Sequence, residues 1–103
     1  MNEQLKFAFA YAKIKPLQRT IIEYLCAYGK HEGNYTTLAA AIGQKVTRTE
    51  NGKVIHGNEP NVRKAVLSLC QCGIVMYNKS IRNGKKESYF SLEDNWTEIV
   101  VNL

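Results

Sequence analysis

The chain has 103 residues, of which 45% are hydrophobic and 22% charged, and its formal net charge is +5. These values are ordinary for one globular domain spanning residues 1–103, and they exclude a disordered or repetitive chain. The sequence holds no apolar run of the roughly 18 residues that a membrane span needs, and it starts without a secretory signal, which predicts a cytoplasmic protein. Its three cysteines favour reduced thiols over a disulfide framework.

The positive charge is concentrated in one part of the chain. Residues 34–92 carry nine Lys and Arg against three acids, whereas residues 93–103 carry three acids and no cation. Clustered positive charge predicts a polyanionic partner, with nucleic acid first and an acidic membrane surface second. The alternative is an ordinary solvated basic surface.

The first clear element in chain order is an amphipathic helix over residues 16–28. Its apolar residues repeat at helical spacing, with a proline in the first turn and a glycine as the stop, namely Pro16, Leu17, Ile21, Leu25, Tyr28 and Gly29. Residues 31–34 are typical of a loop. A second, short helix then starts at a threonine and ends at Gly43, with Leu38, Ala41 and Ile42 as its apolar face.

Two further elements follow before the last third of the chain. Residues 44–57 predict a small hairpin, because Asn51-Gly52 is a favoured pair for a two-residue turn. The stretch over residues 58–73 predicts a third helix with Asn58 as N-cap. Its remaining signals are a proline in the first turn, an apolar stripe and a glycine stop: Pro60, Val62, Ala65, Val66, Leu69 and Gly73.

A longer hairpin is predicted around Asn83-Gly84. A two-residue turn there pairs Tyr77 with Phe90 and Val75 with Leu92 on one face, and it places Asn78 and Tyr89 on the other face. This register buries the base of the hairpin and exposes its tip.

The two ends of the chain are ambiguous between strand and helix. Residues 5–11 alternate like a strand but contain helix-forming alanines, and residues 97–103 are rich in β-branched residues yet also fit a helix. Both ends are apolar enough to require cover from their own core or from a second copy of the chain. We therefore expect a homodimer through the terminal apolar residues Leu5, Phe7, Phe9, Trp96, Ile99 and Val101.

The order helix, short helix, helix, hairpin resembles the winged helix-turn-helix family of DNA-binding domains. The resemblance rests on "TTLAAAIG" followed by "NVRKAVLSLCQCGIV", and it covers residues 16–92. It implies an α+β, mostly α fold with a three-helix core and a C-terminal hairpin as the wing, flanked by extensions 1–15 and 93–103 that suit dimerisation. The chain departs from the family in the 44–57 hairpin, which replaces a tight turn and could add DNA contacts or obstruct the third helix.

Three groups of residues are candidates for binding double-stranded DNA. The wing tip offers cations for phosphate or minor-groove contact, at Lys79, Arg82, Asn83, Lys85 and Lys86. The outward face of the third helix offers side chains that pair with base edges, at Asn61, Arg63, Lys64 and Gln71, with Leu67 in their midst. The start of the first helix offers a helix N-terminus beside Lys13, Lys15 and Arg19. Solvated surfaces, or edge protection in the wing, are the alternatives.

Catalytic and metal-binding patterns are missing from the sequence. It has no phosphate-binding loop, no paired carboxylates beside a histidine, and two histidines, His31 and His56, that fall in predicted loops. Cys70 and Cys72 are interpreted as packing residues. We therefore expect no enzyme activity, no cofactor, no metal and no small-molecule substrate.

The function expected from these observations is sequence-specific binding of double-stranded DNA. The small size resembles that of regulators, or of replication and conjugative-transfer accessory factors of plasmids and phages, and these roles stay open. The alternative is a winged helix module that binds a protein through the apolar surface around Leu67.

Overall fold

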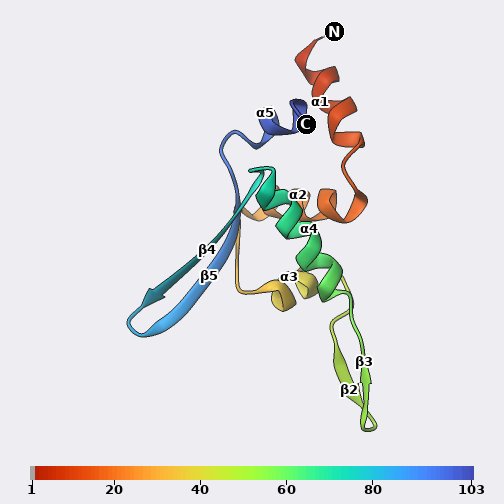
Figure 1. Cartoon of the computed structure of the whole chain (residues 1–103), viewed down its shortest axis with the longest axis vertical. Coiled ribbons are helices and arrows are strands. Elements are labelled where there is room, and N and C mark those ends of the chain that lie inside the picture. Colours follow the sequence, from red (N-terminus) through yellow and green to blue (C-terminus); the bar gives the residue numbers. More distant parts are fainter. Residues whose placement is uncertain (1) are drawn as a thin grey trace.

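The computed structural model describes residues 2–103, which form a mixed α+β fold with a helical body and two antiparallel hairpins that project from it (Figure 1). In chain order, the elements are α1 (Glu3–Ala12), α2 (Pro16–Tyr28), β1 (Lys30–Glu32), α3 (Tyr35–Ala41), β2 (Arg48–Glu50), β3 (Lys53–Ile55), α4 (Glu59–Gln71), β4 (Val75–Arg82), β5 (Lys85–Leu92) and α5 (Trp96–Val101). None of the helices within this range is long and apolar enough to span a membrane.

Helix α2 confirms the prediction for residues 16–28. Pro16 occupies the first turn, where its missing N–H has no partner to lose, and Gly29 ends the helix with a positive φ of 83° while its N–H donates to Leu25 O. Ile21, Ile22 and Leu25 are buried. This helix therefore supplies one wall of the core.

The prediction of a loop over residues 31–34 was wrong in part, because β1 occupies Lys30–Glu32. This strand pairs antiparallel with β5, with His31 opposite Phe90, and completes a three-stranded sheet in the order β1-β5-β4. The pairing continues at Gly33, whose N–H donates to Ser88 O at 2.9 Å. A three-residue strand has too little pattern of its own to be recognised without its distant partner.

Helix α3 confirms the second predicted helix, but its start and its buried face differ from the prediction. Asn34, not a threonine, is the N-cap, and it forms a capping box with Thr37. Leu38 and Ala39 are buried, whereas Ala41 is exposed. The helix is only seven residues long, so its cap is a large part of its local stability.

Helix α4 confirms the third predicted helix and its whole buried stripe of Val62, Ala65, Val66 and Leu69. Asn58 occupies the N-cap position, but its side chain makes no capping bond. Its Oδ1, the atom that would cap the helix, accepts instead from the Asn61 amide at 2.6 Å, and its own amide donates to Gln44 Oε1 at 2.6 Å across the base of the β2–β3 hairpin. Both ends of the side chain are thus used by other side chains and not by the backbone of the first turn.

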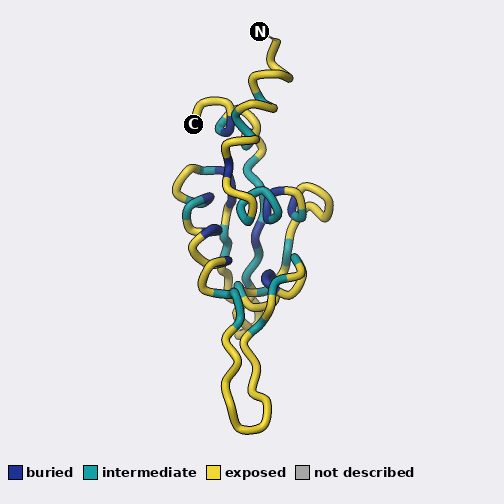
Figure 2. The backbone as a smooth tube through the Cα atoms, turned by 90° about the vertical axis from the view of Figure 1, so that its right-hand side faces the viewer, coloured by how far each residue is buried: buried dark blue, intermediate teal, exposed yellow. Residues whose placement is uncertain are grey.

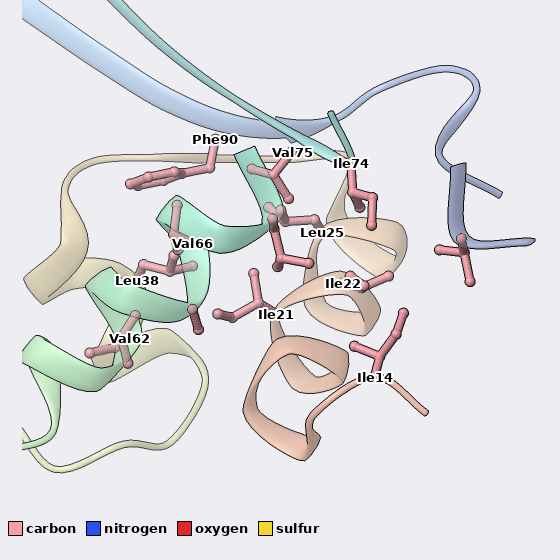
Figure 3. Close-up of a cluster of buried hydrophobic side chains, with 14 residues drawn as sticks. Ile14, Ile21, Ile22, Leu25, Leu38, Val62, Val66, Ile74, Val75 and Phe90 are labelled. Atoms are coloured by element: carbon pink, nitrogen blue, oxygen red, sulfur yellow. The ribbon is translucent and has the colours of Figure 1, made fainter. Parts of the chain in front are cut away.

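The core lies between helices α2, α3 and α4 and the base of the β4–β5 hairpin (Figure 3). Phe90 from β5 projects toward the same cluster as Leu38 and Val66, and Phe90, Leu38 and Val66 are all fully buried. Each such side chain contributes about 1.5 to 3 kcal/mol through burial. The hairpin is therefore fixed to the helical body at its base alone.

Both chain ends are helical, which resolves the ambiguity between strand and helix. Phe7 of α1 meets Trp96 of α5 edge to face, with 5.7 Å between ring centroids, and Val100 of α5 is fully buried. The two helices lie together at the end of the molecule opposite the β2–β3 hairpin (Figure 1). Part of the apolar surface of both ends is therefore covered within the same chain.

The β2–β3 hairpin confirms the predicted excursion over residues 44–57. Asn51 and Gly52 both have positive φ, 52° and 76°, as the two-residue turn requires. None of its strand residues is buried, and Figure 2 shows the hairpin as an exposed arm at one end of the molecule. We call residues 45–56 the arm.

Candidate nucleic-acid interface

The β4–β5 hairpin carries the first of the three groups of residues that were predicted to bind DNA. Its register matches the prediction, with Tyr77 opposite Phe90, Val75 opposite Leu92 and Asn78 opposite Tyr89. The turn at Asn83 and Gly84 has φ values of 52° and 76°. Because eight residues pair on each side of that turn, the tip lies far from the buried base (Figure 1).

All five predicted residues of the hairpin tip are exposed, but they do not share one face. Strand alternation places Lys79 and Lys86 on the face that carries Tyr77 and Phe90, while Arg82 pairs with Lys85 on the opposite face. Asn83 lies in the turn itself. The tip therefore presents positive charge on both sides, a geometry suited to insertion between two rows of phosphates.

An aromatic cluster joins the root of this hairpin to the helices. Tyr77 stacks on Phe90 with 4.3 Å between centroids, and Tyr35 of α3 lies 5.3 Å from Tyr77. Burial raises the pKa of Tyr35, and the nearby guanidinium of Arg63 acts in the opposite direction. The Tyr35 and Tyr77 rings therefore join α3 to the root of the hairpin.

The outward face of α4 lies where the helical spacing predicted. Asn61, Arg63, Lys64 and Gln71 are exposed, and Leu67 in their midst is 43% exposed. The Asn61 amide already donates to Asn58 Oδ1 at 2.6 Å. This face therefore presents three exposed polar side chains, Arg63, Lys64 and Gln71, around the apolar Leu67.

The third predicted cluster lies beside α4. Lys13, Lys15 and Gln18 line the same surface groove as Ser68 of α4, on the side of that helix away from Arg63. Lys13 and Lys15 are exposed, whereas Arg19 is half-buried and its carbonyl accepts from the Tyr11 hydroxyl at 3.4 Å. Phe9, Val101 and Leu103 also line the groove, so this cluster is the rim of an apolar surface and not a purely cationic one.

The histidines and cysteines do not gather into a chemical site. Within residues 2–103, no group of three or more His, Cys, Asp or Glu side chains is placed to hold a metal ion. His31 belongs to β1 and not to a loop, while Cys72 is exposed, contrary to its interpretation as a packing residue. Cys70 does pack against the core, and burial raises the pKa of its thiol.

Some charged residues of this surface were missed in the sequence. Lys30 of β1 lies 5.5 Å from the centre of the Tyr89 ring, near the root of the β4–β5 hairpin, and pairs with Glu32 at 3.1 Å. Lys45, Arg48 and Lys53 extend the positive charge along the arm. The position of Lys30 depends on a strand pairing that the sequence does not reveal. The three cations of the arm, in contrast, could have been identified within the predicted 44–57 hairpin.

Comparison of the chain with protein-family models, with curated proteins and with solved structures finds no match. The candidate interface therefore rests on its own geometry and charge.

Proposed function

We propose that this chain is a winged helix protein that binds double-stranded DNA, with the β4–β5 hairpin as its wing. The order of α2, β1, α3, α4 and the hairpin, with β1 completing the sheet, supports the family. The observation that carries the function is the cationic tip, which stands clear of the core and contributes nothing to its packing. We propose the same mode of action for a regulatory, a replication or a DNA-transfer role.

The wing leads recognition in this proposal. Leu67 occupies the middle of the outward face of α4, where an apolar side chain makes no hydrogen bond to a base edge, and the Asn61 amide already donates to Asn58 Oδ1. Arg82 at the tip suits a narrow minor groove, where negative potential is strongest. Lys13 and Lys15 lie beside α4 and would contact flanking phosphates.

The exposed Leu67 also supports a second candidate function, a module that binds a protein partner. An apolar side chain that is 43% exposed within a polar helix face would be covered by such a contact. Salt distinguishes the two functions, because phosphate contacts weaken steeply as salt rises and apolar contacts do not.

The decisive experiment removes the charge of the tip. Arg82→Ala, Lys85→Ala and Lys86→Ala together leave every buried residue in place, so the fold is expected to persist. Binding to a mixed-sequence duplex of about 30 base pairs, measured across a salt series, should weaken, and the slope of log affinity against log salt should fall by roughly 2 to 3.

The matched control keeps the charge and changes the side chains, with Arg82→Lys, Lys85→Arg and Lys86→Arg. It should retain most of the affinity. Unchanged binding by the folded alanine variant would exclude the wing as a contact. Selection of bound sequences from random-sequence duplexes then shows which element recognises the bases. Arg82→Ala should alter the selected sequences. If Lys64→Ala and Gln71→Ala alter them instead, base recognition belongs to α4.

A further inference from the structure

The strands of the arm have no packing role that explains them. All six residues of β2 and β3 are exposed, among them Val54 at 57% and Ile55 at 39%. The two strands form a sheet of their own, separate from the β1-β5-β4 sheet. An isolated two-stranded hairpin is only marginally stable in water. Its persistence as an ordered projection therefore depends on its root.

That root is tied closely to the N-terminus of α4. Glu59 Oε1 accepts from the Thr47 N–H at 2.9 Å and from the Thr47 hydroxyl at 3.2 Å, and the Gly57 N–H donates to Thr47 Oγ1 at 3.0 Å. The Asn58 N–H donates to Lys45 O at 2.7 Å. These bonds join both strands of the root to the first turn of the helix.

The root leaves no space for a side chain at Gly57. A Cβ there would overlap the Glu59 carboxylate and would lie 2.5 Å from both Lys45 O and Thr47 N. Hydrogen bonds from its own backbone N–H and from Thr47 hold the pKa of Glu59 below its usual value, so the carboxylate stays charged in the root. The close packing of backbone on backbone gives the arm a defined direction relative to α4.

The arm is also cationic. It contains Lys45, Arg48 and Lys53 against the single acid Glu50. Arg48 pairs with Glu50 at 3.2 Å, and within residues 2–103 no carboxylate lies within 4.0 Å of Lys45 or Lys53. Arg48, Glu50 and Lys53 extend from the same face, because Arg48 and Glu50 are two residues apart on β2 and Lys53 is the cross-strand partner of Glu50. The two cations outnumber the one carboxylate on this face, so it can lie against a row of phosphates.

Helix α4 connects the two hairpins, with the root of the arm at its first turn and the β4–β5 hairpin after its last turn. Its 13 residues span roughly 20 Å, and each hairpin adds a projection of its own. The two project from the helical body in different directions, with α3 between them (Figure 1). The longest dimension of the molecule, 56 Å, runs from the end that carries α1 and α5 to the tip of the arm (Figure 1).

We propose that the arm is a second DNA-binding hairpin, which contacts the phosphates of the same duplex as the wing through Lys45, Arg48 and Lys53. The inference rests on the proposed function. The arm would lengthen the bound site by its contacts on the far side of α4. The unusual length of the α3–α4 connection then has a use, because it carries charge to phosphates that the helical body does not reach.

The experiment compares two variants that each lose three cations. One is Lys45→Ala, Arg48→Ala and Lys53→Ala, and the other is the alanine variant of the wing tip. Each is tested by hydroxyl-radical footprinting on a selected duplex and by a salt series of affinities. The arm variant should lower the salt slope by about 2 to 3 and lose protection at one end of the footprint, while the wing variant loses protection elsewhere.

The control for the arm, Lys45→Arg, Arg48→Lys and Lys53→Arg, should retain the full footprint. Wild-type affinity and footprint in the arm variant would overturn the inference while the wing variant still upholds the proposed function. Weaker binding with an unchanged footprint would also overturn it, because only the long-range field would then have changed. Absence of salt-dependent DNA binding by the unaltered protein would instead overturn the proposed function itself.

Discussion

His31 joins three elements through the two nitrogens of one ring. Nδ1 lies 2.9 Å from the Tyr24 hydroxyl of α2, and Nε2 lies 3.0 Å from Thr37 Oγ1 of α3, while the residue itself belongs to β1. The Thr37 hydroxyl also donates to Asn34 O at 3.0 Å, which favours a neutral ring that donates from Nε2 and accepts at Nδ1. One side chain thus holds the sheet against two helices.

This environment predicts a loss of stability in mild acid. Burial lowers the pKa of His31 below 6.5, so the folded state favours the neutral ring. The resulting stability is complete above the unfolded pKa and is lost as pH falls through 6.5 toward the folded value. Urea midpoints at about pH 8 and about pH 5.5 should differ more in the unaltered protein than in His31→Gln. An equal pH dependence in both proteins would contradict the prediction.

At the scale of elements, the helices and hairpins are stabilised both by local signals, such as caps and turns, and by tertiary contacts. Helix α3 has too few residues to be stable alone, and it depends on the capping box of Asn34 and Thr37 and on the burial of Leu38 and Ala39. The two hairpins share the same Asn-Gly turn chemistry but differ in burial. The β4–β5 hairpin is anchored by Phe90, whereas the arm is anchored by polar bonds at its root.

The cap of α3 gives a prediction at this scale. Asn34→Ala removes the acceptor of the Thr37 N–H bond, which is 3.0 Å long, and should reduce the free energy of unfolding by about 1 kcal/mol. Thr36→Ala is the matched control, because Thr36 lies exposed in the same first turn without a capping bond. Chemical denaturation measures both variants. A loss in Asn34→Ala no greater than in the control would show that the cap contributes little.

At the scale of the whole molecule, the three projecting parts leave the helical body in different directions. The paired α1 and α5 lie at one end, the arm at the other, and the β4–β5 hairpin points sideways (Figure 1). Phe7, Trp96 and Ile99 pack within the chain, which removes them from the surface expected to form a dimer. Leu5, Phe9, Val101 and Leu103 remain exposed at that end.

We propose that these remaining apolar residues form the interface of a homodimer. Light scattering at micromolar concentration should then give twice the chain mass of 11.7 kDa. Phe9→Glu should yield a monomer, because it places a charge in the apolar interface. Val54→Glu on the arm is the control, since Val54 is 57% exposed and Phe9 59%. A monomeric mass for the unaltered protein would disprove the dimer.

The sequence by itself determined the elements whose signals are local. Helices α2 and α4 follow from apolar spacing with proline and glycine at their ends, and the β4–β5 register and the turn of the arm follow from Asn-Gly pairs that accept positive φ. The exposure of Arg82, Lys85 and Lys86 at a hairpin tip follows from the same turn. Periodicity and turn chemistry are properties of neighbouring residues, so they can be read without the fold.

Only the tertiary structure decided the parts that depend on distant partners. Strand β1 exists because His31 lies opposite Phe90, far along the chain, and the terminal segments are helices whose apolar sides meet at Phe7 and Trp96. The Asn58 amide donates to Gln44 across the arm root, a contact between segments 14 residues apart. The position of Lys13 and Lys15 beside α4 is likewise decided by the tertiary structure. Such contacts join segments whose encounter no local pattern encodes, because their stability comes from burial and hydrogen bonds made only after the chain has folded.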